Sequence, residues 1–125
     1  MNLISSTDAA IFDVPDTHVT AYAAPSRGST ELCLWRIDIA PGSTSPLHHM
    51  DCEEVFLCLD GRAVIVTSAQ ERQLAAGDCV VLPAQTDFSF RVVGDQPFRA
   101  LACIRVGGQA TMTGSGETFV PPWAA

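Results

Sequence analysis

The chain of 125 residues contains no lysine, and its seven arginines are spread singly along it against fourteen aspartates and glutamates. The resulting net charge of -7 repels phosphate backbones and anionic lipid headgroups. We therefore expect neither nucleic acid nor a membrane surface as a partner.

Long apolar runs are also lacking, since no stretch approaches the roughly 18 residues that a membrane-spanning helix requires. The amino terminus, MNLISSTDAAIFD, has no basic region and carries Asp8 and Asp13, which is not typical of a signal peptide. The five cysteines show no C-x-x-C spacing and mostly lie in apolar runs, which favours free, buried thiols over a disulfide framework. Together these features predict a cytoplasmic location.

The chain does contain many short segments rich in β-branched and aromatic residues, separated by glycine, proline and aspartate. No stretch shows a helical period over ten or more residues. This pattern predicts an all-β sandwich or barrel, with residues 1–125 forming a single domain. The predicted strands lie within residues 31–39, 54–59, 63–67, 79–83, 88–93 and 98–106.

The two ends of the chain differ from this middle region. Residues 1–30 are expected to add an N-terminal strand segment, and residues 107–125 to form an extended tail. Pro121 and Pro122 favour a polyproline conformation that ends in Trp123. Because a large aromatic side chain is seldom left in solvent, we expect Trp123 to pack on its own barrel or on a neighbouring subunit.

Residues 48–61, HHMDCEEVFLCLDG, form part of a spaced motif. Gly42 is followed after five residues by His48, after one more by Met50, after three by Glu54 and after six by Gly61. Fifteen residues later, Gly77 is followed after five residues by Pro83. This spacing resembles the two sequence motifs of the cupin superfamily, and in particular its small single-domain bacterial members. The resemblance implies a double-stranded β-helix, or jelly-roll barrel, over about residues 31–106.

In the cupin superfamily two histidines and a glutamate of the first motif, with a histidine of the second, typically bind a transition metal. The resemblance places these four ligands at His48, Met50, Glu54 and Phe88. The second motif also departs from the family pattern, with Gln85 in place of its glycine and Val92 in place of its asparagine.

The ligand chemistry that remains is poor, because a catalytic site normally has at least three protein ligands and phenylalanine offers none. We therefore expect a degenerate metal site and no cofactor. The alternative is one divalent transition metal held by His48, Glu54 and possibly His49, if a local bulge turns His49 inward.

The alternation of side chains along a strand points Met50, Phe56, Cys58, Phe88 and Phe90 to the inside of such a barrel. We predict that they line a partly apolar ligand pocket. The alternative is that these side chains simply fill a closed barrel.

His48 and Glu54 are weak candidates for catalytic acid and base, and they have a structural alternative as a hydrogen-bonded relic of the metal site. Glu53, Asp51 and His18 are expected at the surface.

The leading functional hypothesis is a metal-independent cupin that binds a small, partly apolar molecule and forms a homodimer. The main alternative is an enzyme, either a metal-dependent oxygenase, isomerase or cyclase, or a cofactor-free acid/base catalyst that uses His48 and Glu54. A third hypothesis is a barrel that serves mainly for oligomerisation. The fold by itself does not choose among them.

Overall fold

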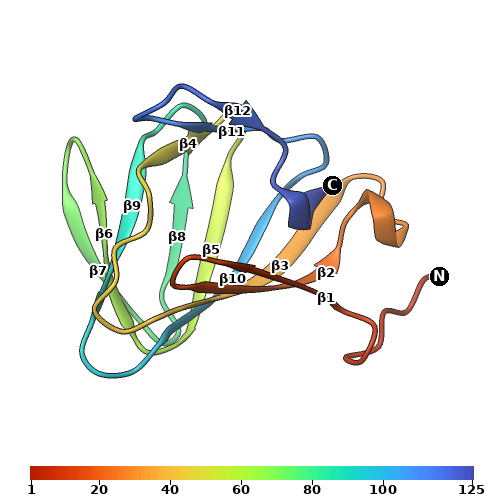
Figure 1. Ribbon diagram of the computed structural model, residues 1–125, viewed down its shortest axis with the longest axis horizontal. Helices are drawn as coiled ribbons and strands as arrows, with labels where there is room; N and C mark the ends of the chain where they lie inside the picture. The colour runs from red at the N-terminus through yellow and green to blue at the C-terminus, as the bar shows by residue number, and fades with distance from the viewer.

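The computed structural model describes all residues from 1 to 125, and it consists of two six-stranded antiparallel sheets that face each other (Figure 1). No helix is long and apolar enough to cross a membrane. The prediction of an all-β jelly-roll barrel is confirmed. The first sheet contains, in spatial order, β1 (Ala10–Val14), β2 (Thr17–Ala23), β3 (Leu32–Ile39), β10 (Phe98–Arg105), β5 (Glu54–Asp60) and β8 (Cys79–Leu82). The second contains β12 (Thr118–Phe119), β11 (Ala110–Met112), β4 (His48–Met50), β9 (Phe88–Val93), β6 (Arg62–Thr67) and β7 (Glu71–Ala75).

Each of the six strands predicted from the sequence lies where it was expected. The strands that were not predicted are short, as β4 and β11 are, or polar, as the ERQLA segment of β7 is. Both ends of the chain also contribute strands, because β1 and β2 extend the first sheet while β11 and β12 extend the second.

The prediction of an extended C-terminal tail is wrong in part. This segment contains β11, β12 and the 3-10 helix η2 (Pro122–Ala124), in which proline occupies the first position, where it needs no hydrogen bond from its nitrogen. Of the two positions expected for Trp123, its own barrel or a neighbouring subunit, the structure shows the first. Its ring centroid lies 6.3 Å from that of Phe12 and 6.4 Å from that of Trp35.

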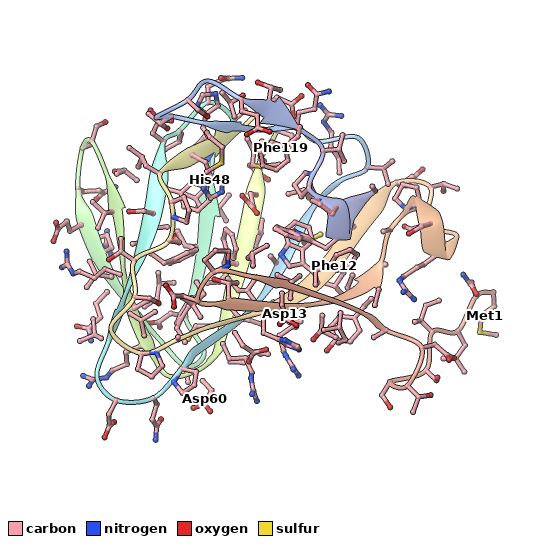
Figure 2. The ribbon with its side chains drawn as sticks, viewed as in Figure 1. Met1, Phe12, Asp13, His48, Asp60 and Phe119 are labelled. Atoms are coloured by element: carbon pink, nitrogen blue, oxygen red, sulfur yellow. The ribbon has the colours of Figure 1, made fainter.

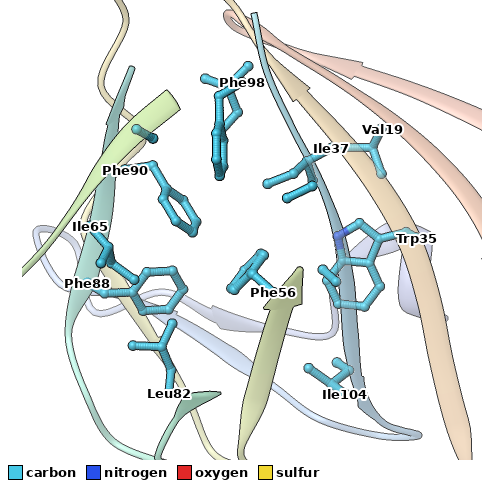
Figure 3. Packing of buried hydrophobic residues seen from close by; sticks show 14 of the residues in the cluster. Val19, Trp35, Ile37, Phe56, Ile65, Leu82, Phe88, Phe90, Phe98 and Ile104 are labelled. Atoms are coloured by element: carbon cyan, nitrogen blue, oxygen red, sulfur yellow. The ribbon is translucent and has the colours of Figure 1, made fainter. Parts of the chain in front are cut away.

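The core is one cluster of 23 buried residues, to which both sheets contribute. Four phenylalanines of three different strands pack against one another inside the barrel (Figure 3). The ring of Phe90 lies 4.9 Å from Phe56 and 5.1 Å from Phe98, and Phe88 lies 5.8 Å from both Phe56 and Phe90. Most of these pairs meet edge to face, the arrangement that aromatic quadrupoles favour.

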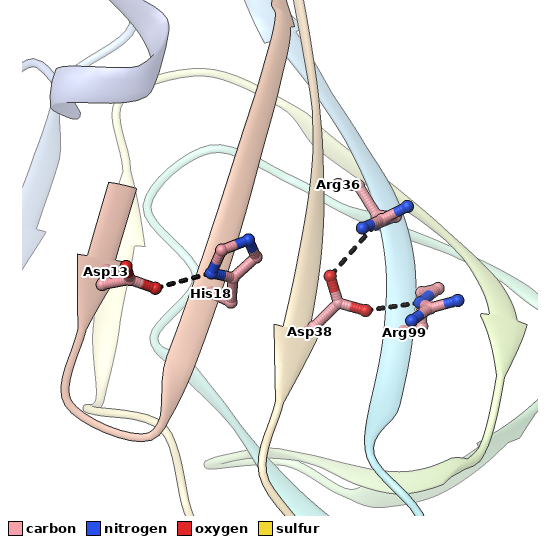
Figure 4. A network of polar contacts seen from close by, with 5 residues as sticks. All are labelled: Asp13, His18, Arg36, Asp38 and Arg99. Carbon is pink, nitrogen blue, oxygen red and sulfur yellow. Dashed lines mark hydrogen bonds and ion pairs between the residues drawn. The ribbon is translucent and has the colours of Figure 1, made fainter. Parts of the chain in front are cut away.

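Polar contacts join residues of β1, β2, β3 and β10 in the first sheet (Figure 4). His18 Nδ1 lies 2.6 Å from Asp13 Oδ1, and Asp38 accepts hydrogen bonds from Arg36 and Arg99. The side chain of His18 is 43% exposed, so its predicted surface position is confirmed.

All five cysteines are free thiols, as predicted, but they are not all buried. Cys33, Cys52 and Cys58 are buried, whereas Cys79 is exposed and Cys103 is half-buried. The expectation of five buried thiols is wrong for the last two because they lie on the outward-facing positions of β8 and β10.

Two turns in the motifs have a residue with a left-handed backbone conformation. Gly61 has φ +73°, and a Cβ at that position would lie 2.2 Å from the carbonyl oxygen of Pro97, so no other residue fits there. Gln85 adopts φ +64° and donates its backbone N–H to Met50 O at 2.8 Å. The residue that replaces the motif glycine thus keeps the left-handed conformation that glycine favours.

Candidate functional site

A cavity of about 250 Å³ opens between the two sheets, and 13 of its 19 lining residues are hydrophobic. The inward positions of β3 supply Trp35, Ile37 and Ile39. The C-terminal segment supplies Phe119, Pro121 and Trp123, while β1 and β2 complete the wall. Figure 2 shows His48 and Phe119 at the same end of the barrel. Both ends of the chain therefore enclose this cavity.

The structure brings the four motif positions together at this cavity. His48, Met50, Glu54 and Phe88 all line it. His48 and Phe88 are direct partners between β4 and β9, and their ring centroids are 4.5 Å apart. The alignment of the second motif onto Phe88 therefore agrees with the strand pairing.

Two of the three other predicted pocket residues, Phe56 and Phe90, also line the cavity. Cys58 does not: it is buried, but its Sγ lies 3.6 Å from Asp60 O and 3.7 Å from Gly61 O at the far end of β5. Four residues of strand separate it from Glu54, which is a distance of roughly 13 Å.

His49 lies on the opposite face of β4 and does not line the cavity. Its Nδ1 is 2.7 Å from Asp87 Oδ1, which also accepts a hydrogen bond from Thr113 Oγ1 at 2.8 Å. The bonds from His49 and then Thr113 hold the pKa of Asp87 below its usual value. The bulge that would turn His49 inward is not present, because β4 keeps its regular alternation.

Glu54 is the buried acid of the cavity. The residue is 3% exposed, and its Oε2 has no hydrogen-bond partner. Loss of hydration raises the pKa of this carboxyl from 4.5 to about 8. The expectation of a hydrogen-bonded relic pair with His48 is wrong, because no bond joins the two side chains.

His48 bonds instead to the backbone, with its Nδ1 2.9 Å from Pro46 O. Because a carbonyl only accepts hydrogen bonds, Nδ1 carries the proton and Nε2 keeps a free lone pair. Burial lowers the pKa of His48, and the bond to Pro46 opposes that shift in part. The cavity therefore holds a neutral imidazole and a carboxyl that favours its protonated form.

These donors do not fit a divalent metal. The four motif positions offer one imidazole, one thioether, one carboxyl that burial keeps protonated, and one phenyl ring. No group of three or more histidine, cysteine, aspartate or glutamate side chains in the chain could hold a metal ion. The arrangement falls short of the three protein ligands of a catalytic metal site.

Sequence reasoning missed the parts of the wall that come from the ends of the chain. Val14 and Thr17 of the N-terminal hairpin and Phe119 of β12 line the cavity but belong to no motif. Only Trp123 gave a signal, as a large aromatic residue after two prolines.

Comparisons with known proteins agree with this geometry. The sequence model of the family described as the cupin domain matches residues 35–104. Auxin-binding protein 5 of Zea mays is 34% identical over 50 residues, which are 40% of this chain and 33% of that protein. Auxin-binding protein 1 of Arabidopsis thaliana is 37% identical over 49 residues, which are 39% of this chain and 25% of that protein. The matched segment thus spans only a quarter to a third of these relatives.

Solved structures give the same fold. The DMSP lyase DddQ from Ruegeria pomeroyi is 28% identical with a TM-score of 0.64, over 71% of this chain and 47% of that chain. The polyketide cyclase RemF from Streptomyces resistomycificus has a TM-score of 0.75 over 98% of this chain and 88% of that chain. At 17% identity, the likeness to RemF concerns the fold alone.

Proposed function

This chain belongs to the cupin family, and we propose that it is a metal-independent binding protein for a small, partly apolar molecule. The observation that carries the proposal is the cavity of about 250 Å³, whose wall is mostly hydrophobic and includes all four ligand positions of the family motif. A concave apolar site with a few polar groups is the usual form of a small-molecule site.

The relatives support the binding of a small molecule without identifying it. The auxin-binding proteins carry that activity in their names, and they match about 40% of this chain. We do not transfer auxin itself, because the matched segment covers a minor part of those proteins.

The absence of a metal requirement is supported by the donor set. Met50 replaces one imidazole with a soft thioether, and Phe88 replaces another with a hydrocarbon ring that packs on His48. We therefore expect ligand binding to persist after treatment with a chelator.

The proposal is tested by filling the cavity. A set of small aromatic compounds is titrated calorimetrically into the chelator-treated protein and into an Ala110→Leu variant, in which a larger side chain enters the cavity wall. Ala69→Leu, in the exposed turn between β6 and β7, is the matched control. Compounds that bind the parent and Ala69→Leu but not Ala110→Leu support the proposal. Binding that Ala110→Leu leaves intact contradicts it.

A second candidate is a cofactor-free acid/base catalyst. Its support is that a neutral acid, Glu54, and a neutral base, His48, line the same cavity, where burial raises the pKa of Glu54 and lowers that of His48. Incubation of each bound compound with the protein, followed by NMR of the recovered compound, separates the candidates. Unchanged compounds support the binding protein, whereas conversion that Glu54→Gln abolishes supports the enzyme.

We also propose a homodimer in the cytoplasm. The exposed side chains of Leu57, Leu59 and Val81 lie on β5 and the edge strand β8, and an edge strand must be covered to avoid unspecific pairing with other chains. Because Trp123 packs on its own barrel, we assign the dimer contact to this sheet face rather than to the tail. Light scattering of Leu57→Glu/Val81→Glu should give a monomer, and an unchanged dimer contradicts that assignment.

Five free thiols support a reducing compartment.

A further inference from the structure

We infer that the ligand is a small, uncharged aromatic molecule of one or two rings that carries a hydrogen-bond acceptor, and that the indole N–H of Trp123 donates to this acceptor. The inference rests on the proposed function, because it concerns the same cavity. It names the chemical class of the ligand and one residue that selects it.

The size of the ligand follows from the cavity volume of about 250 Å³. An apolar cavity of about 150 Å³ holds one benzene molecule. The space in this protein therefore suits one ring with a short substituent or two fused rings.

The preference for an aromatic ring follows from the side chains of the wall. Trp35, Trp123, Phe56, Phe88 and Phe90 all line the cavity. These residues come from both sheets and from the C-terminal segment. Aromatic pairs gain energy beyond the area they bury. A flat ring can contact several of them at once.

The need for an acceptor follows from Trp123. Its Nε1 is buried and has no hydrogen-bond partner, although the residue lines the cavity. An indole N–H only donates, and a buried donor without a partner destabilises the protein. A ligand oxygen that accepts this hydrogen bond removes that cost.

Trp123 is held in a fixed position before any ligand binds. Its ring packs on Phe12 and Trp35, and the next residue, Ala124, is buried, with its carbonyl oxygen 3.4 Å from Cys33 Sγ. Little conformational freedom is therefore lost when its N–H meets a ligand.

Glu54 supplies a second polar group without a partner, since its Oε2 is also buried at the cavity. A carboxyl in its acid form donates one hydrogen bond and accepts others, so it adapts to a carbonyl or a hydroxyl group of the ligand. Glu54 and the indole N–H of Trp123 thus lie in a wall that is mostly hydrophobic.

The absence of charge on the ligand follows from what the wall lacks. No arginine lines the cavity, and the chain contains no lysine and has a net charge of -7. The cavity therefore offers no positive charge to pair with an anionic ligand. A cationic ligand can pair with the carboxyl of Glu54, but it leaves the N–H of Trp123 without an acceptor. A neutral carbonyl or ether oxygen satisfies the donor at no cost in buried charge.

Four probes on one ring frame test the inference by calorimetry: indane, indanone, aminoindane and indane carboxylate. We expect indanone to bind about tenfold more tightly than indane, which corresponds to about 1.4 kcal/mol. Equal binding of indane and indanone overturns the acceptor requirement and leaves the proposed function intact. Tighter binding of the amine or the carboxylate overturns the uncharged class. If no probe binds, both the inference and the proposed cavity function fall.

Two variants locate the donor. Trp123→Phe should abolish the preference for indanone over indane, whereas Trp35→Phe, which removes the other indole N–H of the cavity wall, should keep it. A preference that Trp35→Phe abolishes and Trp123→Phe keeps overturns the assignment. A second measurement uses the unaltered protein and needs no variant to fold. The Trp123 indole N–H resonance should move downfield with indanone and not with indane, and an unmoved resonance overturns the assignment.

Discussion

Two pairs of neighbouring residues show how strongly the inside and the outside of the barrel differ. His48 lies against the ring of Phe88 at the cavity, while His49 on the outer face lies 2.7 Å from the carboxylate of Asp87. Glu54 is 3% exposed at the cavity, while Glu53 is exposed. Histidine and glutamate thus meet an apolar interior on one side and solvent on the other.

The side chains at the cavity-lining motif positions therefore differ in chemistry from the family's metal ligands, although the spacing of the motif is kept. Inside, the lack of partners favours a neutral imidazole and a protonated carboxyl. Outside, a hydrogen-bonded pair holds the Asp87 carboxylate in its charged form. The following variants alter either the cavity side chains or the outer ones.

The largest effect should come from rebuilding the cavity-lining motif positions as a metal site. Met50→His combined with Phe88→His places two imidazoles beside His48 and Glu54, which gives four nitrogen and oxygen donors around one cavity. We expect cobalt or nickel to bind with micromolar affinity, or about 8 kcal/mol, where the parent shows none. The bound-metal absorption spectrum reports the binding.

His49→Ala in the same double variant is the control for that experiment. Because His49 lies on the outer face, its loss should leave the new metal affinity unchanged. A folded double variant that binds metal no better than the parent would contradict the assignment of Phe88 to the second motif.

The second effect concerns pH and the buried acid. The pKa of Glu54 is raised from 4.5 to about 8, so the folded state holds this proton more tightly than the unfolded state. The contribution of Glu54 to stability is therefore fully present below pH 4.5 and is lost as the pH rises through about 8. At about 1.4 kcal/mol per pKa unit, the full loss is on the order of 5 kcal/mol.

Glu54→Gln should abolish this loss, so that the variant gains stability relative to the parent as the pH rises. Urea unfolding at acid, neutral and alkaline pH measures the difference, and Glu53→Gln is the matched control. Parallel pH profiles for the parent and Glu54→Gln would show that Glu54 is not a buried neutral acid.

A smaller effect is expected at the turn that precedes β9. Gln85 is exposed and adopts φ +64°, a left-handed conformation that costs a residue with a side chain about 1 kcal/mol. Gln85→Gly should therefore raise the free energy of unfolding by about 0.5–1 kcal/mol. Gly61→Ala is the opposite control and should destabilise the protein, because its Cβ would meet Pro97 O.

The smallest effect belongs to the outer pair. The lowered pKa of Asp87 means that its contribution to stability is present above the unfolded pKa and is lost as the pH falls through the folded value. Asp87→Asn should lower the melting temperature slightly at neutral pH and not at all in strong acid. A difference that persists in strong acid would contradict a role for the Asp87 charge.

The sequence predicted the fold and the motif positions for physical reasons. Alternating apolar residues between turns located six strands, and turn positions such as Gly61 fixed the spacing that put His48, Met50 and Glu54 at one cavity. These features are local, so a pattern within a few residues reports them.

Contacts between distant segments could not be predicted in the same way. The packing of Trp123 on Phe12 and Trp35 joins the two ends of the chain with β3, and no local pattern encodes it. The alternation rule also placed Cys58 on the correct face but did not show that it lies beyond the cavity. The missing bond between His48 and Glu54 depends on Pro46 O, a backbone partner that side-chain patterns do not reveal.

The most direct test of the central claim is the affinity of indanone for chelator-treated protein, measured by calorimetry with and without added zinc, manganese, nickel or iron. The account predicts the same dissociation constant in every sample, because the cavity binds through aromatic side chains and the Trp123 donor. Binding that disappears with the chelator and returns with one metal would contradict it.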